Sequence, residues 1–314
     1  MNIFDIVIVN WNSGTQLKEC MQSIEKAKKD NCKINKVIVV DNASSDNSLN
    51  DITIINLQIE IIRNNENLGF GKACNIGAAN LNNDFVLFLN PDTIIYENTF
   101  INLFSYIEEN NSEHIGIYGI QLQDENKIVQ RTCARFPTMW SFIIRSIGLN
   151  KINNNLFKSY TMHEWDHLKS EFVDQVIGAF FMIKHDLYIQ LNGFDQRYFV
   201  YYEELDFSKR ASLIGYKTKY VVKAQAYHKG GGISDNVKAK RLFYNLQSRI
   251  IYSFKHFGVF RGIIIMLVTM IIEPFSRFFL LVSKGKIDEI PELIHGYKDI
   301  FLNIFTIIGK GLKK

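Results

Sequence analysis

Short apolar runs alternate with amphipathic segments over the first part of the chain. The runs at 4–9, 37–40, 59–63 and 85–89 are typical of buried strands, whereas the segments at 15–28, 71–81 and 98–109 have the periodicity of helices. Strands joined by helices make right-handed crossovers, so this alternation predicts a parallel sheet in an α/β fold. Pro91 cannot continue a buried strand, and the last of these runs therefore ends close to Leu89.

The second half of the chain has a less regular pattern. We expect an irregular connection over 135–170, which includes Asn153, Asn154 and Asn155. Regular structure is predicted again as a strand over 173–183, a helix over 204–213, a strand over 216–222 and a helix over 237–257.

The composition is that of a folded protein. A chain of 314 residues with 47% hydrophobic and 22% charged residues can bury a large core, in one large domain or two smaller ones, and is no disordered polyelectrolyte. The four cysteines lack metal-ligand spacing, which predicts a reduced cytosolic compartment. Met1 leads almost directly into the first predicted strand, so we expect no export signal.

The net charge of +4 is concentrated at the end of the chain. Residues 255–314 contain nine Lys or Arg against five Asp or Glu, and the remaining residues are neutral overall. A nucleic-acid groove needs a basic stripe on the folded domain, and none is apparent in the sequence. We therefore expect no nucleic-acid partner.

Polar clusters follow each of the four early strands, at 10–14, 41–46, 64–71 and 90–92. The carboxyl edge of an open α/β sheet is where ligands bind, so these clusters predict a site at one edge. Asp92 could hold Mg²⁺ against a nucleotide diphosphate, and Asp41 could accept the ring N–H of uracil or thymine. Gly69 and Gly71 would let the backbone approach a ribose or diphosphate closely. Each cluster alone is ordinary turn chemistry.

Two nucleotide-binding classes do not fit these clusters. The glycines at 69 and 71 lack the third glycine of the dinucleotide fingerprint and do not follow the first strand. No Gly-Lys-Ser or Gly-Lys-Thr of a phosphate-binding loop occurs.

The second half adds ionisable groups. Glu203, Glu204 and Asp206 lie at a predicted helix start, where the helix dipole favours carboxylates. Adjacent Glu203 and Glu204 point in different directions, so at most one faces a given acceptor hydroxyl. Asp206 is expected to pair with Arg210 one turn later. His228 precedes three glycines and is either structural or a metal ligand.

Together these residues resemble the successive motifs of the family 2 inverting glycosyltransferases, in its rhamnosyltransferase-like branch of bacterial surface polysaccharide synthesis. The motifs run in order from about Ile3 to about Phe257. They are Val7-Ile-Val-Asn-Trp-Asn12, Asp41-Asn42, Asn67-Leu-Gly-Phe-Gly71, Leu89-Asn-Pro-Asp-Thr93, Gly178-Ala-Phe180, Gly193-Phe-Asp195, Tyr202-Glu-Glu-Leu-Asp206 and His228-Lys-Gly-Gly231. The resemblance implies a GT-A fold, with a Rossmann-like nucleotide half joined to an acceptor half.

The resemblance also implies a donor site for a nucleoside diphosphate sugar. The residues that would hold the base and ribose are Val9, Asn10, Trp11, Asn12 and Asp41, and those along the ribose and diphosphate are Asn67, Gly69 and Gly71. Asn90 stands where many relatives have the first carboxylate of an Asp-x-Asp motif, so Asp92 would bind the divalent cation, Mg²⁺ or Mn²⁺, with His228 as a second ligand. Glu204 occupies the place of the family's general base, usually Asp, and Glu203 remains the alternative.

The function implied is inverting sugar transfer from a nucleoside diphosphate donor, with rhamnose from dTDP-rhamnose as the best assignment, to a hydroxyl of a growing, lipid-linked surface glycan. A sugar nucleotidyltransferase is one alternative, although it would need a basic, glycine-rich loop after the first strand, and Asn10-Trp-Asn-Ser-Gly14 contains no Lys or Arg. A catalytically silent, membrane-bound glycan-binding homologue is the other.

Beyond a glycosyltransferase domain at 1–257, residues 258–314 form a separate apolar segment. The run at 262–272 is shorter than the roughly 20 residues of a spanning helix, which favours a buried or interfacial segment. Lysines flank the last apolar run, 300–308, as suits an anionic membrane surface. We expect a cytoplasmic protein peripheral on the inner face of the cell membrane, with pairing of two copies as a homodimer as the alternative role of this segment.

Overall fold

The computed structural model describes residues 1–50, 52, 56–110, 114–152, 157, 159–162, 164–230 and 238–313. The chain forms two compact units, each assembled from three separate stretches of sequence. Unit 1 comprises Met1–Arg135, Trp165–Asp195 and Glu204–Gly232, and unit 2 comprises Phe136–Glu164, Gln196–Glu203 and Ile233–Lys314. The predicted domain boundary after residue 257 stays a prediction.

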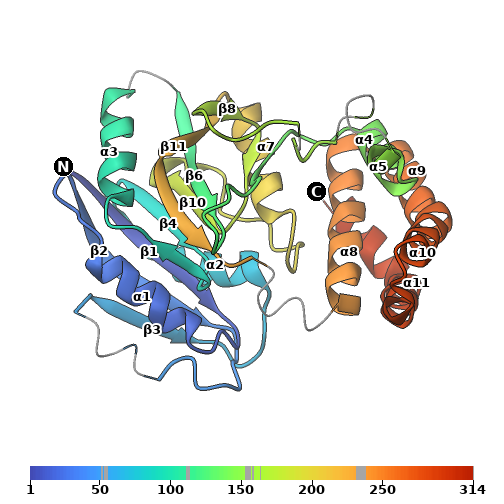
Figure 1. The fold of residues 1–314 in the computed structure, drawn as a ribbon, viewed down its shortest axis with the longest axis horizontal. Coiled ribbons are helices and arrows are strands. Elements are labelled where there is room, and N and C mark those ends of the chain that lie inside the picture. The colour runs from blue at the N-terminus through green and yellow to red at the C-terminus, as the bar shows by residue number, and fades with distance from the viewer. Residues whose placement is uncertain are drawn as a thin grey trace. The chain divides into compact units, whose positions relative to one another are not determined.

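A nine-stranded sheet is the centre of unit 1 (Figure 1). Its strands are β1 (Asn2–Asn10), β2 (Cys32–Asp41), β3 (Ile59–Arg63), β4 (Phe85–Leu89), β5 (Thr93–Ile95), β6 (Ile115–Gln123), β8 (Glu171–Val173), β10 (Phe180–Lys184) and β11 (Lys217–His228). They lie in the order β3-β2-β1-β4-β10-β6-β11-β5, and β8 pairs with β11. A separate two-stranded sheet pairs β7 (Cys133–Ala134) with β9 (Gln175–Val176).

The sheet is parallel in its first half and mixed in its second. Strands β3, β2, β1 and β4 pair in parallel, which confirms the prediction for these strands. Strand β10 runs antiparallel to both β4 and β6, and β5 runs antiparallel to β11. Strand β10 follows β9 through a short turn at Gly178, without the helical crossover that parallel neighbours need. The sheet is therefore parallel where strands and helices alternate in sequence and mixed beyond β4.

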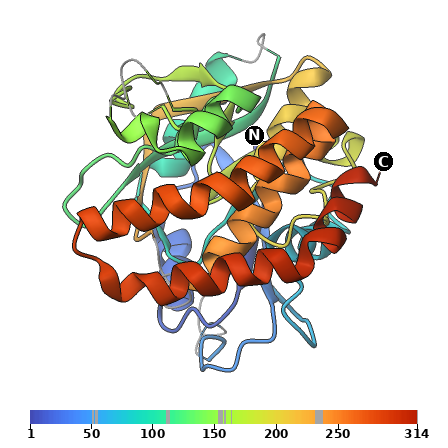
Figure 2. The same cartoon turned by 90° about the vertical axis from the view of Figure 1, so that its right-hand side faces the viewer.

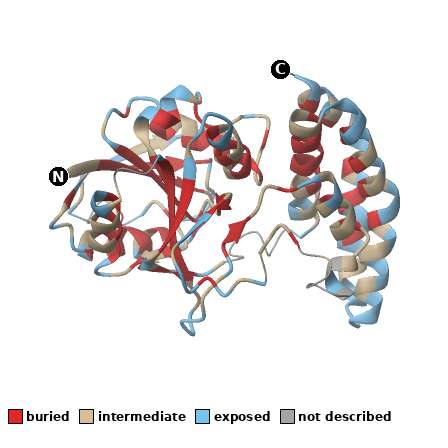
Figure 3. Ribbon diagram, turned by 90° about the horizontal axis from the view of Figure 1, so that it is seen from above, coloured by how far each residue is buried: buried red, intermediate tan, exposed pale blue. Residues whose placement is uncertain are grey.

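Helices cover both faces of the parallel strands. Helices α1 (Gln16–Lys26) and α3 (Thr99–Glu109) share a buried cluster with Phe4 and Ile6 on one face. Helix α2 (Phe70–Ala78) lies on the other face, where a Cβ atom at Gly77 would come within 2.6 Å of Val7. Burial on both faces explains the uninterrupted apolar run of β4, and the central strands are drawn largely as buried in Figure 3. Unit 1 also contains α6 (His185–Gln190) and most of α7 (Glu203–Leu213).

Three predicted elements differ from the structure. The strand expected over 173–183 is divided among β8, β9 and β10, and the strand expected over 216–222 continues to His228. The stretch expected to be irregular contains α4 (Met139–Ser146) and α5 (Leu149–Ile152). A capping box between Thr138 and Ser141 starts α4 and was a local signal for that helix. The asparagines at 153–155, the glycine loop from 231 and the predicted helix start at 237 lie outside the described residues.

Unit 2 is helical (Figure 2). Its main helices are α8 (Lys238–Phe257), α9 (Val259–Leu267), α10 (Glu273–Ser283) and α11 (Ile290–Leu312), with a π-helical turn at Val268–Ile272 and a 3-10 turn at Ile287–Glu289. Helix α8 packs against α9 and α11, and Gly262 and Gly311 let those helices approach the ring of Phe254. Val259–Ser283 is a continuous helix of 25 residues, and an 18-residue window in it has a mean hydropathy of 2.0. It is long and apolar enough to span a membrane, although the sequence predicted shorter runs.

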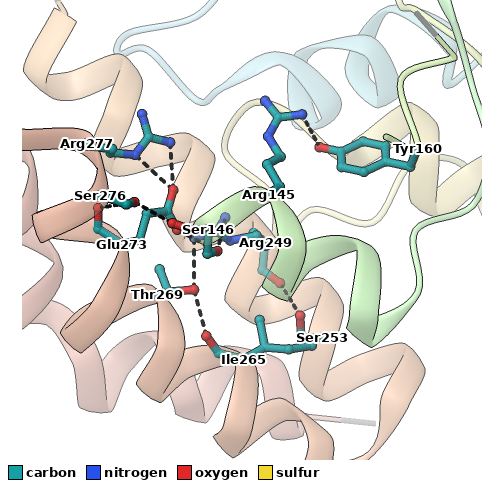
Figure 4. Close-up of polar contacts among 10 residues, drawn as sticks. All are labelled: Arg145, Ser146, Tyr160, Arg249, Ser253, Ile265, Thr269, Glu273, Ser276 and Arg277. Atoms are coloured by element: carbon teal, nitrogen blue, oxygen red, sulfur yellow. Dashed lines mark hydrogen bonds and ion pairs between the residues drawn. The ribbon is translucent and has the colours of Figure 1, made fainter. Parts of the chain in front are cut away.

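A buried ion-pair network joins three helices of unit 2 (Figure 4). Arg249 of α8 and Glu273 of α10 are both 2% exposed and form an ion pair, and Arg277 binds the second Glu273 oxygen at 2.7 Å. Ser146 of α4 donates to Glu273 at 2.9 Å, and Thr269 accepts from Arg249 at 2.8 Å. Burial alone would raise the pKa of Glu273, but Arg249 and Arg277 lower it to about 2.

Removal of one partner from this network leaves a charge buried without compensation. We expect Glu273→Ala to lower the free energy of unfolding of unit 2 by about 3–5 kcal/mol, measured by urea denaturation. The folded pKa of about 2 lies below the ordinary 4.5, so the contribution is complete above pH 4.5 and is lost as the pH falls towards 2. Glu289→Ala, which removes only surface pairs with Lys238 and Lys286, is the control. Equal midpoints for the two variants would contradict a structural role for Glu273.

Candidate active site

The polar clusters after β1 to β4 meet at one edge of the sheet in unit 1. Asn10 pairs with Asp41 in the β1–β2 register, and Asp41 pairs with Arg63 in the β2–β3 register. Leu89 pairs with Ile8, so the Asn90 turn follows β4 beside the end of β1. Residue His228 pairs with Thr93, which brings the end of β11 to the same turn.

Asn10 organises the loop around Asp41. Its side-chain amide lies 2.7 Å from Asp41 Oδ1 and 2.8 Å from Ser48 Oγ, and its carbonyl oxygen accepts from Ser13. Asn10 is fully buried, and Asp41 is 5% exposed and also accepts from the Ser44 amide at 3.2 Å. The Asn10 side chain is therefore engaged within the protein, and the carboxylate that it orients is the group with acceptor capacity left for a ligand.

The other predicted residues of this loop have different surroundings. Asn12 adopts a positive φ of 51°, and its side-chain Oδ1 accepts a hydrogen bond from the Ser45 amide at 2.7 Å. Val9 is 8% exposed within β1, whereas Trp11 is half-buried. The loop after β1 and the loop after β2 are thus tied together through Asn12 as well as Asn10.

Within the described residues, no side chain caps the start of α2, which follows the loop at 64–69. Gly69 has a φ of 82°, a conformation that favours glycine, and its amide donates to Asn67 Oδ1 at 2.9 Å. Helix α2 starts at Phe70 with no side-chain cap, so its first amides, including that of Gly71, can face an anion. Asn42, absent from the predicted site residues, connects these loops by donating to Gly69 O at 3.2 Å and accepting from Asn64 at 2.8 Å.

Asp92 and His228 form the candidate metal-binding pair. His228 Nε2 lies 3.5 Å from Asp92 Oδ1, which is buried and has no hydrogen-bond partner among the described residues. Gln130 donates to His228 O at 2.6 Å, so its carbonyl oxygen faces His228 Nδ1 at 2.9 Å. That oxygen can only accept, and the proton therefore lies on Nδ1 and leaves the Nε2 lone pair towards Asp92.

This donor set fits a hard divalent cation that also binds substrate. Burial lowers the pKa of His228 despite the nearby Asp92, which keeps the imidazole neutral and able to ligate. The described part of the chain has no cluster of three or more His, Cys, Asp or Glu that could form a complete metal cage. Mg²⁺ and Mn²⁺ sites that share a nucleotide diphosphate need only one or two protein ligands. The sequence missed Gln130, because nothing local relates it to a histidine that follows 98 residues later.

Glu204 is the candidate general base. Its Oε1 accepts from the Gly178 amide at 3.3 Å, and its Oε2 is buried without a hydrogen-bond partner in the described structure. Burial raises the pKa of Glu204, and the hydrogen bonds to it only partly offset this. A carboxylate with a raised pKa and one vacant oxygen can remove a proton from an alcohol.

The segment Gly178-Ala179 connects this carboxylate to the Asn90 turn. Ala179 O accepts from the Asn90 amide at 3.1 Å and from Thr93 Oγ1 at 3.3 Å. Two consecutive residues therefore contact Glu204 and the turn that carries Asp92. Asn90 acts here through its backbone.

The neighbouring carboxylates have other surroundings. Asp206 is fully buried and pairs with Arg210 Nε at 2.7 Å, as expected from their spacing. Glu203 is 3% exposed and belongs to unit 2, whereas the sheet edge belongs to unit 1. Tyr201 and Tyr202 both have positive φ values, 67° and 72°, directly before Glu203. Such backbone strain costs on the order of 1–3 kcal/mol per residue and is concentrated at functional sites.

The mixed sheet with helices on both faces and polar loops at one edge is the GT-A fold of glycosyltransferases. The mannosyltransferase PcManGT from Pyrobaculum calidifontis, solved with GDP-Man and Mn²⁺, matches with a TM-score of 0.56 and 12% identity over 96% of this chain and 87% of its own. S. aureus TarS 1-349 in complex with UDP-GlcNAc matches with a TM-score of 0.53 and 19% identity over 94% of this chain and 79% of its own.

Residues 5–180, more than half of the chain, match glycosyl transferase family 2. The chain belongs to this family and is a glycosyltransferase of the rhamnosyltransferase-like kind. It is 29% identical to rhamnosyltransferase WbbL of Escherichia coli K12, over 59% of this chain and 69% of that protein. It is also 22% identical to the N-acetylglucosaminyl-diphospho-decaprenol L-rhamnosyltransferase of Mycobacterium tuberculosis, over 83% of this chain and 87% of that protein.

The turn at Gly193 is hydrogen-bonded to helix α2 through Asn75. Asn75 of α2 accepts from the Phe194 amide at 2.9 Å and from Tyr188 at 2.6 Å, and Arg210 donates to Gly193 O at 2.8 Å. Gly193 has a φ of 67°, and a Cβ atom there would lie 2.6 Å from Asn75 Oδ1.

We expect Gly193→Ala to destabilise unit 1 by about 1–3 kcal/mol, because it adds backbone strain and displaces Asn75. The melting temperature measures the effect. Gly14→Ala is the control, since Gly14 has a similar φ of 56° but open space around a Cβ atom. Equal losses in both variants would mean that the φ value alone matters and that the Asn75 contact contributes nothing.

Proposed function

We propose that this protein is an inverting, metal-dependent rhamnosyltransferase that transfers rhamnose from dTDP-rhamnose to a hydroxyl of a lipid-linked surface glycan. The observation that carries the proposal is the connection of Glu204, through Gly178 and Ala179, to the turn that holds Asp92. Both relatives are named as rhamnosyltransferases, which supports rhamnose as the sugar, and the name of the mycobacterial relative supports a diphosphate lipid as the acceptor carrier.

The donor would bind along the edge formed by the first three loops. Asp41, oriented by Asn10, would accept the ring N–H of the thymine base. The amides at the start of α2 and the backbone at Gly69 would lie against the diphosphate. Asp92 and His228 would hold Mg²⁺ or Mn²⁺, which, when bound, would neutralise charge on the leaving diphosphate.

Glu204 would perform the acid–base chemistry. Its vacant Oε2 would take the proton of the acceptor hydroxyl as that oxygen attacks the anomeric carbon from the face opposite the diphosphate, so the anomeric configuration inverts. Deprotonated Glu204 is the active form. Its raised pKa makes it a stronger base than an exposed glutamate once it is ionised.

The exposed apolar face of unit 2 supports docking on the inner membrane surface. Phe260, Phe275, Phe279, Leu302 and Phe305 are each 63–86% exposed. Large apolar side chains exposed on three helices, α9, α10 and α11, are typical of a membrane or protein interface. The excess of Lys and Arg over Asp and Glu in this region favours an anionic membrane over a second, equally basic copy of the chain.

Glu204→Gln should lower kcat about 10²–10⁴-fold and leave the binding of dTDP with Mn²⁺ nearly unchanged, because the amide keeps the shape but cannot accept the proton. Turnover of dTDP-rhamnose measures the loss. Activity of the native protein should fall as the pH drops through the raised pKa of Glu204, since protonation removes the base. Glu203→Gln is the matched control. A larger loss in the control would move the role of base to Glu203.

Gln130→Leu should weaken Mn²⁺-dependent binding of dTDP about 10–100-fold, because His228 loses the partner that sets its tautomer. Asp92→Ala should weaken the same binding further, and Gln130→Glu, which keeps an acceptor oxygen, should restore it. Calorimetric titration of dTDP with and without Mn²⁺ gives the values. Native affinity in Asp92→Ala would remove this carboxylate from the metal site.

A further inference from the structure

Unit 2 contains a cavity whose wall is cationic. The cavity has a volume of about 740 Å³, lies among α4, α5 and α10, and is lined by Arg145, Lys151 and Arg277. A second cavity of about 450 Å³ shares Arg145 and Arg277, and its wall also contains Lys238 and Arg241 together with Glu289 and Glu292. Both volumes are in the range of ligand sites. The sheet-edge site in unit 1 uses none of these residues.

The positive charge of the larger cavity is not neutralised by the described residues. Glu273 is its only acidic lining residue in the described structure, and both Glu273 oxygens are engaged by Arg249 and Arg277. Arg145 donates to the neutral hydroxyl of Tyr160 at 3.0 Å. Partial burial, together with Arg277, Lys284 and Arg145, lowers the pKa of Lys151. Like charges held together in this way favour the binding of an anion.

The cations are also positioned in advance. Arg277 is fixed through Nε and Nη2 to Glu273, which is itself anchored by Arg249 and Ser146. Figure 4 shows the side chains of Arg145 and Arg277 extending to the same side of the network. Guanidinium groups held in this way bind phosphate oxygens with directed hydrogen bonds at little cost in side-chain entropy.

An apolar surface borders the cationic wall. Phe279 lines the larger cavity and is 66% exposed, and Leu280 lines both cavities. Phe275 and Val282 of the same helix are 63% and 45% exposed. A free phosphate or a nucleotide would gain nothing from this border, whereas an amphiphile would place its anionic head on the arginines and its chain along α10.

We propose that this cavity binds the diphosphate of the lipid carrier to which the acceptor glycan is attached. The assignment rests on the proposed function and adds the acceptor's anchoring group to it. Phosphate oxygens would contact Arg145, Lys151 and Arg277, and the hydrocarbon chain would leave over Phe279. The glycan acceptor would thus be held by its lipid end, independently of the sugar that is transferred.

Farnesyl diphosphate, a soluble lipid diphosphate, is the probe, and binding to the full chain is measured by calorimetry. The Arg145→Gln/Lys151→Gln variant should bind it about 100-fold more weakly, because each lost charge-assisted hydrogen bond is worth about tenfold. Lys298→Gln, an exposed cation of α11 outside both cavities, should bind as the native chain does. Inorganic pyrophosphate should bind at least tenfold more weakly than farnesyl diphosphate. Both variants should keep the native melting temperature, since neither touches the Glu273 network.

Three results would overturn the proposal. The first is native affinity for farnesyl diphosphate in the double variant, and the second is equal affinity of the native chain for pyrophosphate and farnesyl diphosphate. The third comes from binding to phosphatidylglycerol vesicles: if the double variant loses affinity for these vesicles but not for farnesyl diphosphate, the cations bind phospholipid headgroups. Slow hydrolysis of dTDP-rhamnose and binding of dTDP with Mn²⁺ are measured on the same samples. They should be unchanged in the double variant. Their absence in the native chain would reject the proposed function alone, because binding of farnesyl diphosphate does not depend on them.

Discussion

The hydrogen bonds of Gly178 and Ala179 are the contacts on which the site depends. One amide contacts Glu204, and the next carbonyl oxygen contacts the backbone of Asn90 and the side chain of Thr93. They exist because β10 enters antiparallel beside β4, so that its beginning meets the end of that strand at one edge. A parallel strand at this position would present its carboxyl end, and the segment before it would lie at the opposite edge. The change from parallel to antiparallel pairing is thus what connects the Asn90 turn at this sheet edge to the carboxylate of Glu204.

Helix α10 contains both a buried charged residue and exposed apolar residues. Its Glu273 is buried in an ion-pair network, while Phe275 and Phe279 on the same helix are exposed. A buried ion pair is weak support for stability, because desolvation offsets the attraction, but it strongly disfavours any packing that would leave one charge alone. The network therefore fixes how α4, α8 and α10 pack while leaving an apolar face uncovered. Under the proposed function, unit 2 would provide a surface for lipid and unit 1 a site for a nucleotide sugar.

Local patterns predicted most of unit 1 and less of unit 2. The bounds of β3 and β4 match the predicted runs. Strand β4 is buried throughout and Pro91 follows two residues after its end, whereas β3 contains the exposed Glu60 and Arg63. Helix α4 was missed despite its capping box, since an irregular composition surrounds it. Asp41, Asp92, Glu204 and His228 were identified from motifs. Gln130 was not, because an amide that positions another side chain has no local signature, and Asn42, although part of the Asp41-Asn42 motif, was given no role.

The sequence by itself determined which segments can form buried strands and which chemical groups stand at their ends, since both follow from side-chain size, polarity and proline. It could not decide between neighbouring carboxylates. Glu203 and Glu204 are adjacent, yet Glu203 belongs to unit 2, whereas Glu204 accepts from the Gly178 amide in unit 1 and burial raises its pKa. Only the tertiary structure made that difference, because the free energy of a charge depends on the dipoles and ions that distant segments bring to it.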